Sequence, residues 1–217
     1  AYAIVASLVG SEMCIRDRLK EIPQPCRLLV TAHDAHAVAE LAPDAEVVNR
    51  RSLRSVLRSI GRVDAVVFGG GSLLQDSTSL RSLIYYLVII AIARLRGCPV
   101  LLWGQGLGPL QRRISRAMVR LLLPSCSSAS WRDQTSMDRA RRWAPQLPMQ
   151  LAPDPVWGLQ RQSWAGGQSI VVCWRPSPLL ALREWTVLLN ALQALAEELD
   201  APVRWLAFHR HQDAELL

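Results

Sequence analysis

Unbroken apolar runs and amphipathic stretches alternate along most of the chain. Where Val, Ile and Leu follow one another without polar alternation, the pattern predicts strands covered on both faces, and apolar residues at the helical spacing predict helices. The predicted strands cover residues 26–31, 46–48, 63–68, 100–103, 128–131 and 149–152, and the predicted helices cover 34–41, 52–61, 80–96, 111–123 and 133–143. This alternation, with short connections, predicts an α/β fold built on a mostly parallel sheet.

A second α/β region is predicted after a polar stretch. Residues 160–168 are rich in Arg, Gln, Ser and Gly and indicate a linker. Beyond it, strands are predicted at 169–174 and 203–207, with an amphipathic helix at 185–200. We therefore expect an N-terminal α/β domain over residues 19–159, and over residues 169–217 the start of a C-terminal α/β domain that is truncated.

Residues 1–18 are expected to lie outside the fold. The stretch from Ser7 to Arg18 closely resembles translated sequencing-adaptor sequence, which was never selected to complement this core. A signal peptide is the alternative, but no initiating Met or basic leader is present and polar residues at 10–12 interrupt the apolar run. On the adaptor interpretation the natural amino terminus is missing, and the stop at Leu217 indicates that the carboxyl terminus is missing too.

Composition narrows the class of protein. Half of the residues are hydrophobic, enough to bury a substantial core, and the net charge of +7 favours anionic partners weakly. The five cysteines are odd in number and widely spaced, which indicates a reducing, cytoplasmic setting and disfavours a cysteine metal site. The apolar run at 83–93 is shorter than the ~20 residues that span a bilayer. A role at a membrane surface stays open for this helix.

Polar residues and glycines gather where the predicted strands end. In open α/β sheets ligands bind beyond the carboxyl ends of the strands, glycines let the backbone approach a ligand, and guanidinium groups pair with carboxylate or phosphate oxygens in one plane. The candidate substrate-binding residues are Gly69, Gly70, Gly71, Ser72, Gln75, Asp76, Gln105, Arg132, Asp154, Arg175 and His209. Structural roles stay open for them: the glycines can form a tight turn alone, Gln105 can hold a loop together, and Arg132 can form a surface ion pair. The neighbouring Asp133 is more typical of a helix cap.

Other kinds of site are disfavoured by their spacing. His209, His211 and Asp213 suggest a metal, but a site needs three or more converging ligands and no other histidine lies nearby in the sequence. Arginine clusters lie at 112–113 and 139–142, but neither aromatic residues for stacking nor a recognised nucleic-acid-binding module accompanies them. They are interpreted as solvated helix faces. P-loop and G-x-G-x-x-G sequences are absent. We therefore expect neither a metal nor a nucleic-acid partner.

A set of short motifs resembles one enzyme family when its members are taken together. The motifs are Phe68-Gly-Gly-Gly-Ser-Leu-Leu-Gln-Asp76, Tyr85-Tyr86, Gly104-Gln-Gly-Leu-Gly-Pro109, Trp131-Arg-Asp133 with Ser136, Ala152-Pro-Asp-Pro-Val156 and Phe208-His-Arg-His-Gln-Asp213. In order and spacing they are similar to the polysaccharide pyruvyltransferase family, especially its branch that acts on bacterial cell-wall polymers. The resemblance extends over residues 20–217.

This resemblance implies a glycosyltransferase-B-like fold of two Rossmann-like parallel-sheet domains. It also implies transfer of a pyruvyl group from phosphoenolpyruvate to a sugar of a cell-surface polysaccharide precursor, forming a ketal, with no cofactor besides this donor substrate. Arg132 would hold the charge of the donor, with Arg175 as a second contact. The family's amino-terminal Gly-Asn-x-Gly-Asp loop is absent, and its Arg-x-His segment, which supplies the general acid, would lie beyond Leu217. We therefore expect this fragment to be inactive on its own.

The expected partners are phosphoenolpyruvate and a sugar or lipid-linked glycan acceptor, and peripheral association with a membrane stays open. Two alternatives remain: a glycosyltransferase of the same fold that uses a nucleotide sugar, since fold alone does not separate the two activities, and a non-catalytic module that binds a sugar polymer. We also expect the glycine segments at 69–71 and 104–108 to lie side by side on one rim, because they follow consecutive strands of a parallel sheet.

Overall fold

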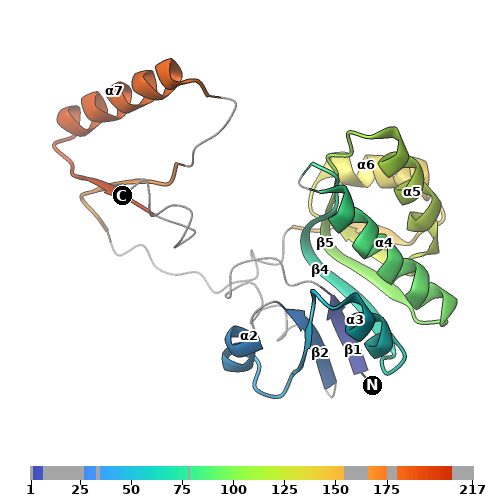
Figure 1. Cartoon of the computed structure of the whole chain (residues 1–217). Coiled ribbons are helices and arrows are strands. Elements are labelled where there is room, and N and C mark those ends of the chain that lie inside the picture. Colours follow the sequence, from blue (N-terminus) through green and yellow to red (C-terminus); the bar gives the residue numbers. More distant parts are fainter. Residues whose placement is uncertain are drawn as a thin grey trace. The chain divides into compact units, whose positions relative to one another are not determined.

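A computed structural model of the chain describes residues 2–6, 27–32, 35–77, 79–153, 166–174 and 180–206. The chain divides into two compact units, Ala1–Gln160 and Arg161–Leu217, whose helices and strands are drawn in Figure 1. Each unit combines helices with parallel strands in a Rossmann-like manner. The predicted α/β fold class is therefore confirmed.

The larger unit is built on one sheet in which all strand pairs among the described residues are parallel. Its seven described strands lie in the order β3-β2-β1-β4-β5-β6-β7. They are β1 Tyr2–Ala6, β2 Arg27–Ala32, β3 Glu46–Asn49, β4 Ala65–Leu74, β5 Val100–Leu107, β6 Ser128–Trp131 and β7 Met149–Leu151. The direction of winding reverses between β1 and β4, and sheets of this kind bind ligands beyond the carboxyl ends of the strands at such a point.

Helices follow the strands in the order that the sequence pattern predicts. They are α2 Ala35–Leu41, α3 Leu53–Ile60, α4 Leu80–Leu95, α5 Arg113–Leu122, the 3-10 turn η1 Leu123–Ser125, and α6 Gln134–Trp143. Serine residues cap two of these helices: Ser52 accepts a hydrogen bond from Ser55 N, and Ser79 accepts one from Ser82 N. Helix α4 packs on β4 and β5 and also contacts α3 and α5, which explains why it lacks a polar face.

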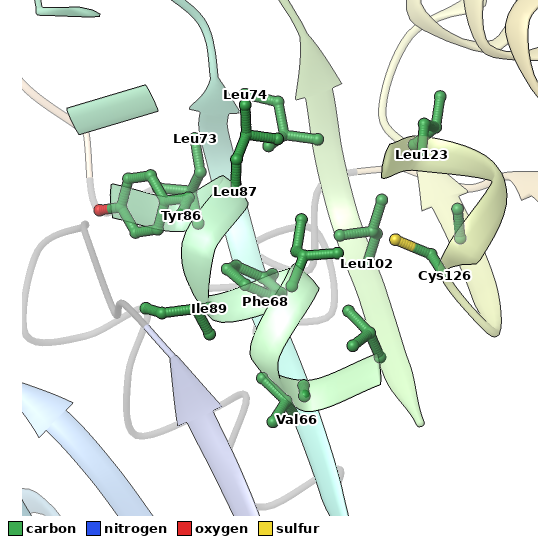
Figure 2. Close-up of a cluster of buried hydrophobic side chains, with 14 of the residues drawn as sticks. Val66, Phe68, Leu73, Leu74, Tyr86, Leu87, Ile89, Leu102, Leu123 and Cys126 are labelled. Atoms are coloured by element: carbon green, nitrogen blue, oxygen red, sulfur yellow. The ribbon is translucent and has the colours of Figure 1, made fainter. Parts of the chain in front are cut away.

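The core lies between α4 and the strands beneath it. Figure 2 shows the side chains of Phe68 from β4, Leu102 from β5 and Tyr86 from α4 gathered in this layer. The rings of Phe68 and Tyr86 meet edge to face, with centroids 6.1 Å apart. Val66, Val67 and Phe68 are consecutive and all buried, as expected of a strand covered on both faces.

The expectation that residues 1–18 lie outside the fold is wrong for Tyr2–Ala6. This segment forms β1, which pairs with β2 on one side and β4 on the other, so that Ala3 lies opposite both Leu28 and Ala65. An apolar strand can fill this position because the two neighbouring strands would otherwise leave backbone donors and acceptors unpaired. Residues 7–26, which include the adaptor-like stretch, lie outside the described residues.

The smaller unit contains strands β8 Ile170–Val172 and β9 Val203–Trp205, which pair in parallel, and helix α7 Leu182–Glu198 between them in sequence. The ring of Trp174 lies against the rings of Trp185 and Trp205, with centroids 6.1 Å and 5.9 Å away. None of the residues of α7 is buried in the described structure.

Candidate functional site

The two glycine segments lie side by side at the carboxyl end of the sheet, which confirms the prediction of a shared rim. Gly69 pairs with Trp103, and Gly71 pairs with Gln105. The segments were predicted to be loops, but they belong to the strands, because β4 continues to Leu74 and β5 continues to Leu107. Glycine is required at Gly70 and Gly71, whose φ angles are 61° and 78°. The register shifts between Gly71 and Leu74, so the strand is distorted where the site lies.

Gln105 joins the two glycine strands. Its side chain is fully buried, and Nε2 donates hydrogen bonds to the carbonyl oxygens of Phe68 at 3.1 Å and Gly70 at 2.7 Å. Two bonds to one strand from its neighbour hold the irregular backbone of β4 in place. The geometry therefore favours the structural alternative for Gln105, a staple, over direct contact with a substrate.

Arg132 follows β6 directly, and its side chain is exposed. Its backbone N–H donates to the carbonyl oxygen of Gln105 at 3.0 Å, which extends the strand pairing one residue beyond β6. Its Nη2 donates to Ser72 Oγ at 2.9 Å. The carboxyl ends of β4, β5 and β6 thus hold one guanidinium group at the edge of the sheet, where it meets solvent.

Gly106 provides the space for this contact. A Cβ atom on Gly106 would lie 2.5 Å from Ser72 Oγ and 3.2 Å and 3.3 Å from Nε and Nη2 of Arg132. Contacts this short mean that a side chain here would displace the serine or the guanidinium. Gly106 was not predicted to be a site residue, although its place in Gly104-Gln-Gly-Leu-Gly108 was the signal for it.

Asp76 anchors the segment that leads from β5 into α5. The residue is buried, its Oδ1 accepts from Gln111 N at 2.7 Å, and its Oδ2 accepts from Arg112 N at 2.9 Å. The pKa of Asp76 is lowered from 3.8 to about 2. The largest cause is the Ser115 hydroxyl, which lies beside the carboxylate without a hydrogen bond of standard geometry, and the next is the hydrogen bond from the Gln111 N–H. Both carboxylate oxygens are committed to the backbone, so Asp76 positions the segment after β5 instead of facing a ligand.

The end of β5 is also tied to α6. Asp133 caps α6 by accepting hydrogen bonds from Ser136 N at 2.7 Å and Ser136 Oγ at 2.8 Å, so the structural alternative for Asp133 is confirmed. The same Ser136 Oγ accepts from Leu107 N at 2.8 Å, and Arg139 Nη1 donates to the Leu107 carbonyl at 2.7 Å. These contacts tie the end of β5 to the start of α6, directly after Arg132.

The other predicted residues have different positions. Gln75 is half-buried, and its Oε1 accepts a hydrogen bond from the Ser77 hydroxyl. Asp154, Arg175 and His209 lie outside the described residues. One buried serine was missed by the sequence analysis, because a serine inside an apolar strand gives no local signal: Ser130 Oγ accepts from Gly104 N at 2.7 Å.

The assembled group is suited to an anion. Arg132 supplies a planar cation and Ser72 supplies a hydroxyl beside it. Within the described part of the chain, no three His, Cys, Asp or Glu side chains are grouped closely enough to bind a metal ion.

Sequence comparison identifies the relatives of this chain. The family model for polysaccharide pyruvyl transferase matches residues 14–214. The chain belongs to this family. The resemblance drawn from the motifs is thereby confirmed, and the family is one of transferases. A comparison with curated proteins finds no match.

Solved structures show where the fold recurs. UDP-N-acetylglucosamine 2-epimerase from Rickettsia bellii is similar with a TM-score of 0.51 and 12% identity, over 94% of this chain and 60% of that one. At this identity the likeness shows the fold alone, and it supports the expected glycosyltransferase-B-like class. The chain spans less than two thirds of the length of that epimerase.

Two further solved structures are less similar to this chain. A triphenylmethane reductase from Citrobacter sp. has a TM-score of 0.43 and 15% identity over 60% of this chain and 48% of that one. Saccharopine dehydrogenase from Saccharomyces cerevisiae has a TM-score of 0.37 and 8% identity over 60% and 26%. Neither likeness is strong enough to support an argument about function.

A search of the described helices finds none with the length and apolar character needed to cross a membrane.

Proposed function

We propose that this chain forms the donor-binding part of an enzyme that transfers a pyruvyl group from phosphoenolpyruvate to a sugar of a cell-surface polysaccharide precursor. The observation that carries the proposal is the Arg132 guanidinium, which Ser72 holds over Gly106 at the carboxyl edge of the sheet. Phosphoenolpyruvate has a carboxylate and a phosphate, and a guanidinium binds either group through two oxygens at once. Membership of the family supports pyruvyl transfer as the reaction.

The proposed reaction converts two acceptor hydroxyls and one donor into a ketal and inorganic phosphate. Both acceptor oxygens bond to C2 of the donor, the C2–O bond to phosphate breaks, and C3 takes up a proton to become a methyl group. Of the two protons that the hydroxyls lose, one is accounted for by the new methyl group and the other by the released phosphate. The role of Arg132 is to neutralise donor charge as it shifts toward the leaving group. Asp154, Arg175 and His209 remain proposed substrate contacts, the general acid is assigned to no residue, and no cofactor is proposed.

We place this activity in the cytoplasm. Cys98, Cys126 and Cys173 are free thiols, as expected in a reducing compartment. The acceptor we propose is a sugar of a glycan precursor, and a lipid-linked precursor would be met at the membrane surface.

Donor binding to the chain tests the proposal without requiring turnover. Isothermal titration with phosphoenolpyruvate should give a dissociation constant that Arg132→Lys raises about tenfold or more, because an ammonium cannot replace a bidentate contact and hydrogen bonds to charged groups contribute about 1.5 to 3 kcal/mol. Arg54→Lys is the matched control, since Arg54 is exposed on α3. The melting temperature of each variant reports whether the fold is intact.

Three results would overturn the proposal. If Arg132→Lys binds phosphoenolpyruvate as tightly as the parent chain, Arg132 is a surface residue and not a donor contact. If the parent chain binds UDP-N-acetylglucosamine and not phosphoenolpyruvate, the rival glycosyltransferase is supported instead. Binding of a sugar polymer without either donor would support the non-catalytic module.

A further inference from the structure

Helix α5 presents a face that the donor site does not use. Arg113, Arg116 and Arg120 are exposed on this helix. The same helix exposes two large aliphatic side chains, Ile114 at 58% and Leu121 at 77%. Its sequence contains no Asp or Glu, and neither does that of α4, which it contacts. One exposed helix therefore presents guanidinium groups and large aliphatic side chains together.

An aromatic residue extends the same face. Trp143, the last residue of α6, lines a hollow of about 420 Å³ together with Arg113, Arg116, Ala117 and Arg120. Figure 1 shows α5 and α6 next to each other at the end of the larger unit. Arginine side chains carry long aliphatic stems, so a hollow bordered by three of them and an indole ring can take up an apolar group while the cations stay at its rim.

The chemistry of this face fits one class of partner best. A nucleic acid would satisfy the arginines but leave Ile114 and Leu121 in water, because it offers phosphate and no aliphatic layer along its backbone. An anionic bilayer offers both: phosphate groups for the guanidinium groups, and an interfacial zone that accepts aliphatic and Trp side chains.

We propose that the exposed face of α5, together with Trp143, docks the chain on an anionic phospholipid bilayer. Arg113, Arg116 and Arg120 bind lipid phosphates, while Ile114 and Leu121 enter the interface between headgroups and acyl chains. The inference deepens the proposed function, because it names the surface that would bring the enzyme to a lipid-linked acceptor. It rests on α5 and Trp143 alone and uses none of the residues of the donor site.

Vesicle sedimentation tests this docking with the 217-residue chain. The chain should sediment with vesicles of equal parts phosphatidylcholine and phosphatidylglycerol, should bind phosphatidylcholine vesicles much less, and should be released as salt is added. The double variant Arg116→Glu with Arg120→Glu should weaken partitioning by about thirtyfold or more, because each basic residue near an anionic surface contributes a factor of about five.

A matched pair of arginines serves as the control for charge. Arg54→Glu with Arg58→Glu changes the net charge by the same amount, at the same spacing of four residues, on the exposed side of α3. Partitioning of this control should stay within about twofold of the parent. For the aliphatic part, Ile114→Ser with Leu121→Ser should weaken binding although no charge changes, whereas Leu182→Ser, at an 84% exposed position of α7, should not.

Several outcomes would overturn the inference. Failure of the parent chain to bind anionic vesicles would do so, as would equal losses in the α5 and α3 arginine variants, which would indicate attraction by net charge alone. If the chain bound duplex RNA through the same arginines and did not bind vesicles, the face would be assigned to nucleic acid. Phosphoenolpyruvate titration of the same variants separates this result from the donor proposal, because the α5 variants should bind the donor normally.

Discussion

At the scale of single residues, three uncharged neighbours help to position Arg132. Ser72 binds its Nη2, the Gln105 carbonyl binds its backbone N–H, and Gly106 leaves the space in which the guanidinium lies. Ser72 and Arg132 were both predicted from the sequence to be site residues. Their direct contact was not predicted, because 60 residues separate them and no local pattern reports such a pairing.

Gly106→Ala should displace the guanidinium. The added Cβ would lie 2.5 Å from Ser72 Oγ, so the serine or Arg132 must move, with a loss of stability of about 1 to 3 kcal/mol and weaker binding of phosphoenolpyruvate. Urea denaturation and titration calorimetry measure the two effects. Gly61→Ala is the control, because its Cβ would lie 2.9 Å from the terminal Nη1 of the exposed Arg96, which can move away. Donor affinity equal to that of the parent in Gly106→Ala would contradict the steric role.

Asp76 predicts a pH dependence of stability. Its pKa is lowered from 3.8 in the unfolded chain to about 2 in the folded chain, so the ionised carboxylate stabilises the fold fully above pH ~4, and this contribution is lost as the pH falls toward 2. Asp76→Asn should be less stable than the parent at neutral pH, because an amide NH2 then faces a backbone N–H of Gln111 or Arg112. The gap between the two urea midpoints should narrow below pH ~4.

Asp44→Asn, at an exposed turn position, is the control for this titration. The difference between the urea midpoints of the parent and Asp76→Asn could also stay constant over the acidic range in which both proteins fold. That result would show that the contacts of the Asp76 carboxylate do not depend on its ionisation.

At the scale of whole elements, β1 makes the sheet continuous. Without Tyr2–Ala6, β2 and β4 would have no partner between them, and the strand order would be interrupted at the point where the winding reverses. This segment was expected to lie outside the fold because residues 1–18 include a stretch that resembles adaptor sequence, a criterion that concerns the origin of the residues. Strand pairing depends only on backbone groups and apolar side chains, so a short β-branched segment can pair whatever its origin.

Hydrogen exchange tests the position of β1. The amides of Ile4 and Val5 should exchange about a hundredfold or more slowly than unprotected amides, because they lie in a strand that is paired on both sides. The amide of Asp44 in an exposed turn gives the unprotected reference within the same sample. Exchange at the reference rate at both Ile4 and Val5 would remove β1 from the sheet.

At the scale of the whole molecule, the two units differ in how much of their helices they bury. Helix α5 buries Ser115 and Val119, whereas the described structure shows no buried residue in α7. Local stability follows from such burial, and regions with few buried contacts open more readily.

Limited trypsin digestion should therefore cut α7 before α5. Arg183 and Arg116 are both exposed and both lie in helices, so the difference in cleavage reports on local unfolding and not on access alone. Mass spectrometry of the early fragments should show cleavage at Arg183 first and a surviving fragment that retains residues 27–151. Early cleavage at Arg116 would contradict the difference in stability.

The sequence by itself determined the alternation of strands and helices, the caps at Ser52, Ser79 and Asp133, the bounds of β6 and the family. These depend on local periodicity, on side chains that bond within one turn, or on motifs with fixed spacing. Only the tertiary structure decided that the glycine segments continue two strands, that Gln105 joins them, that Asp76 anchors the segment before α5 and that Tyr2–Ala6 enters the sheet. Each of these depends on backbone groups supplied by a distant segment, and such partners meet only once the chain has folded.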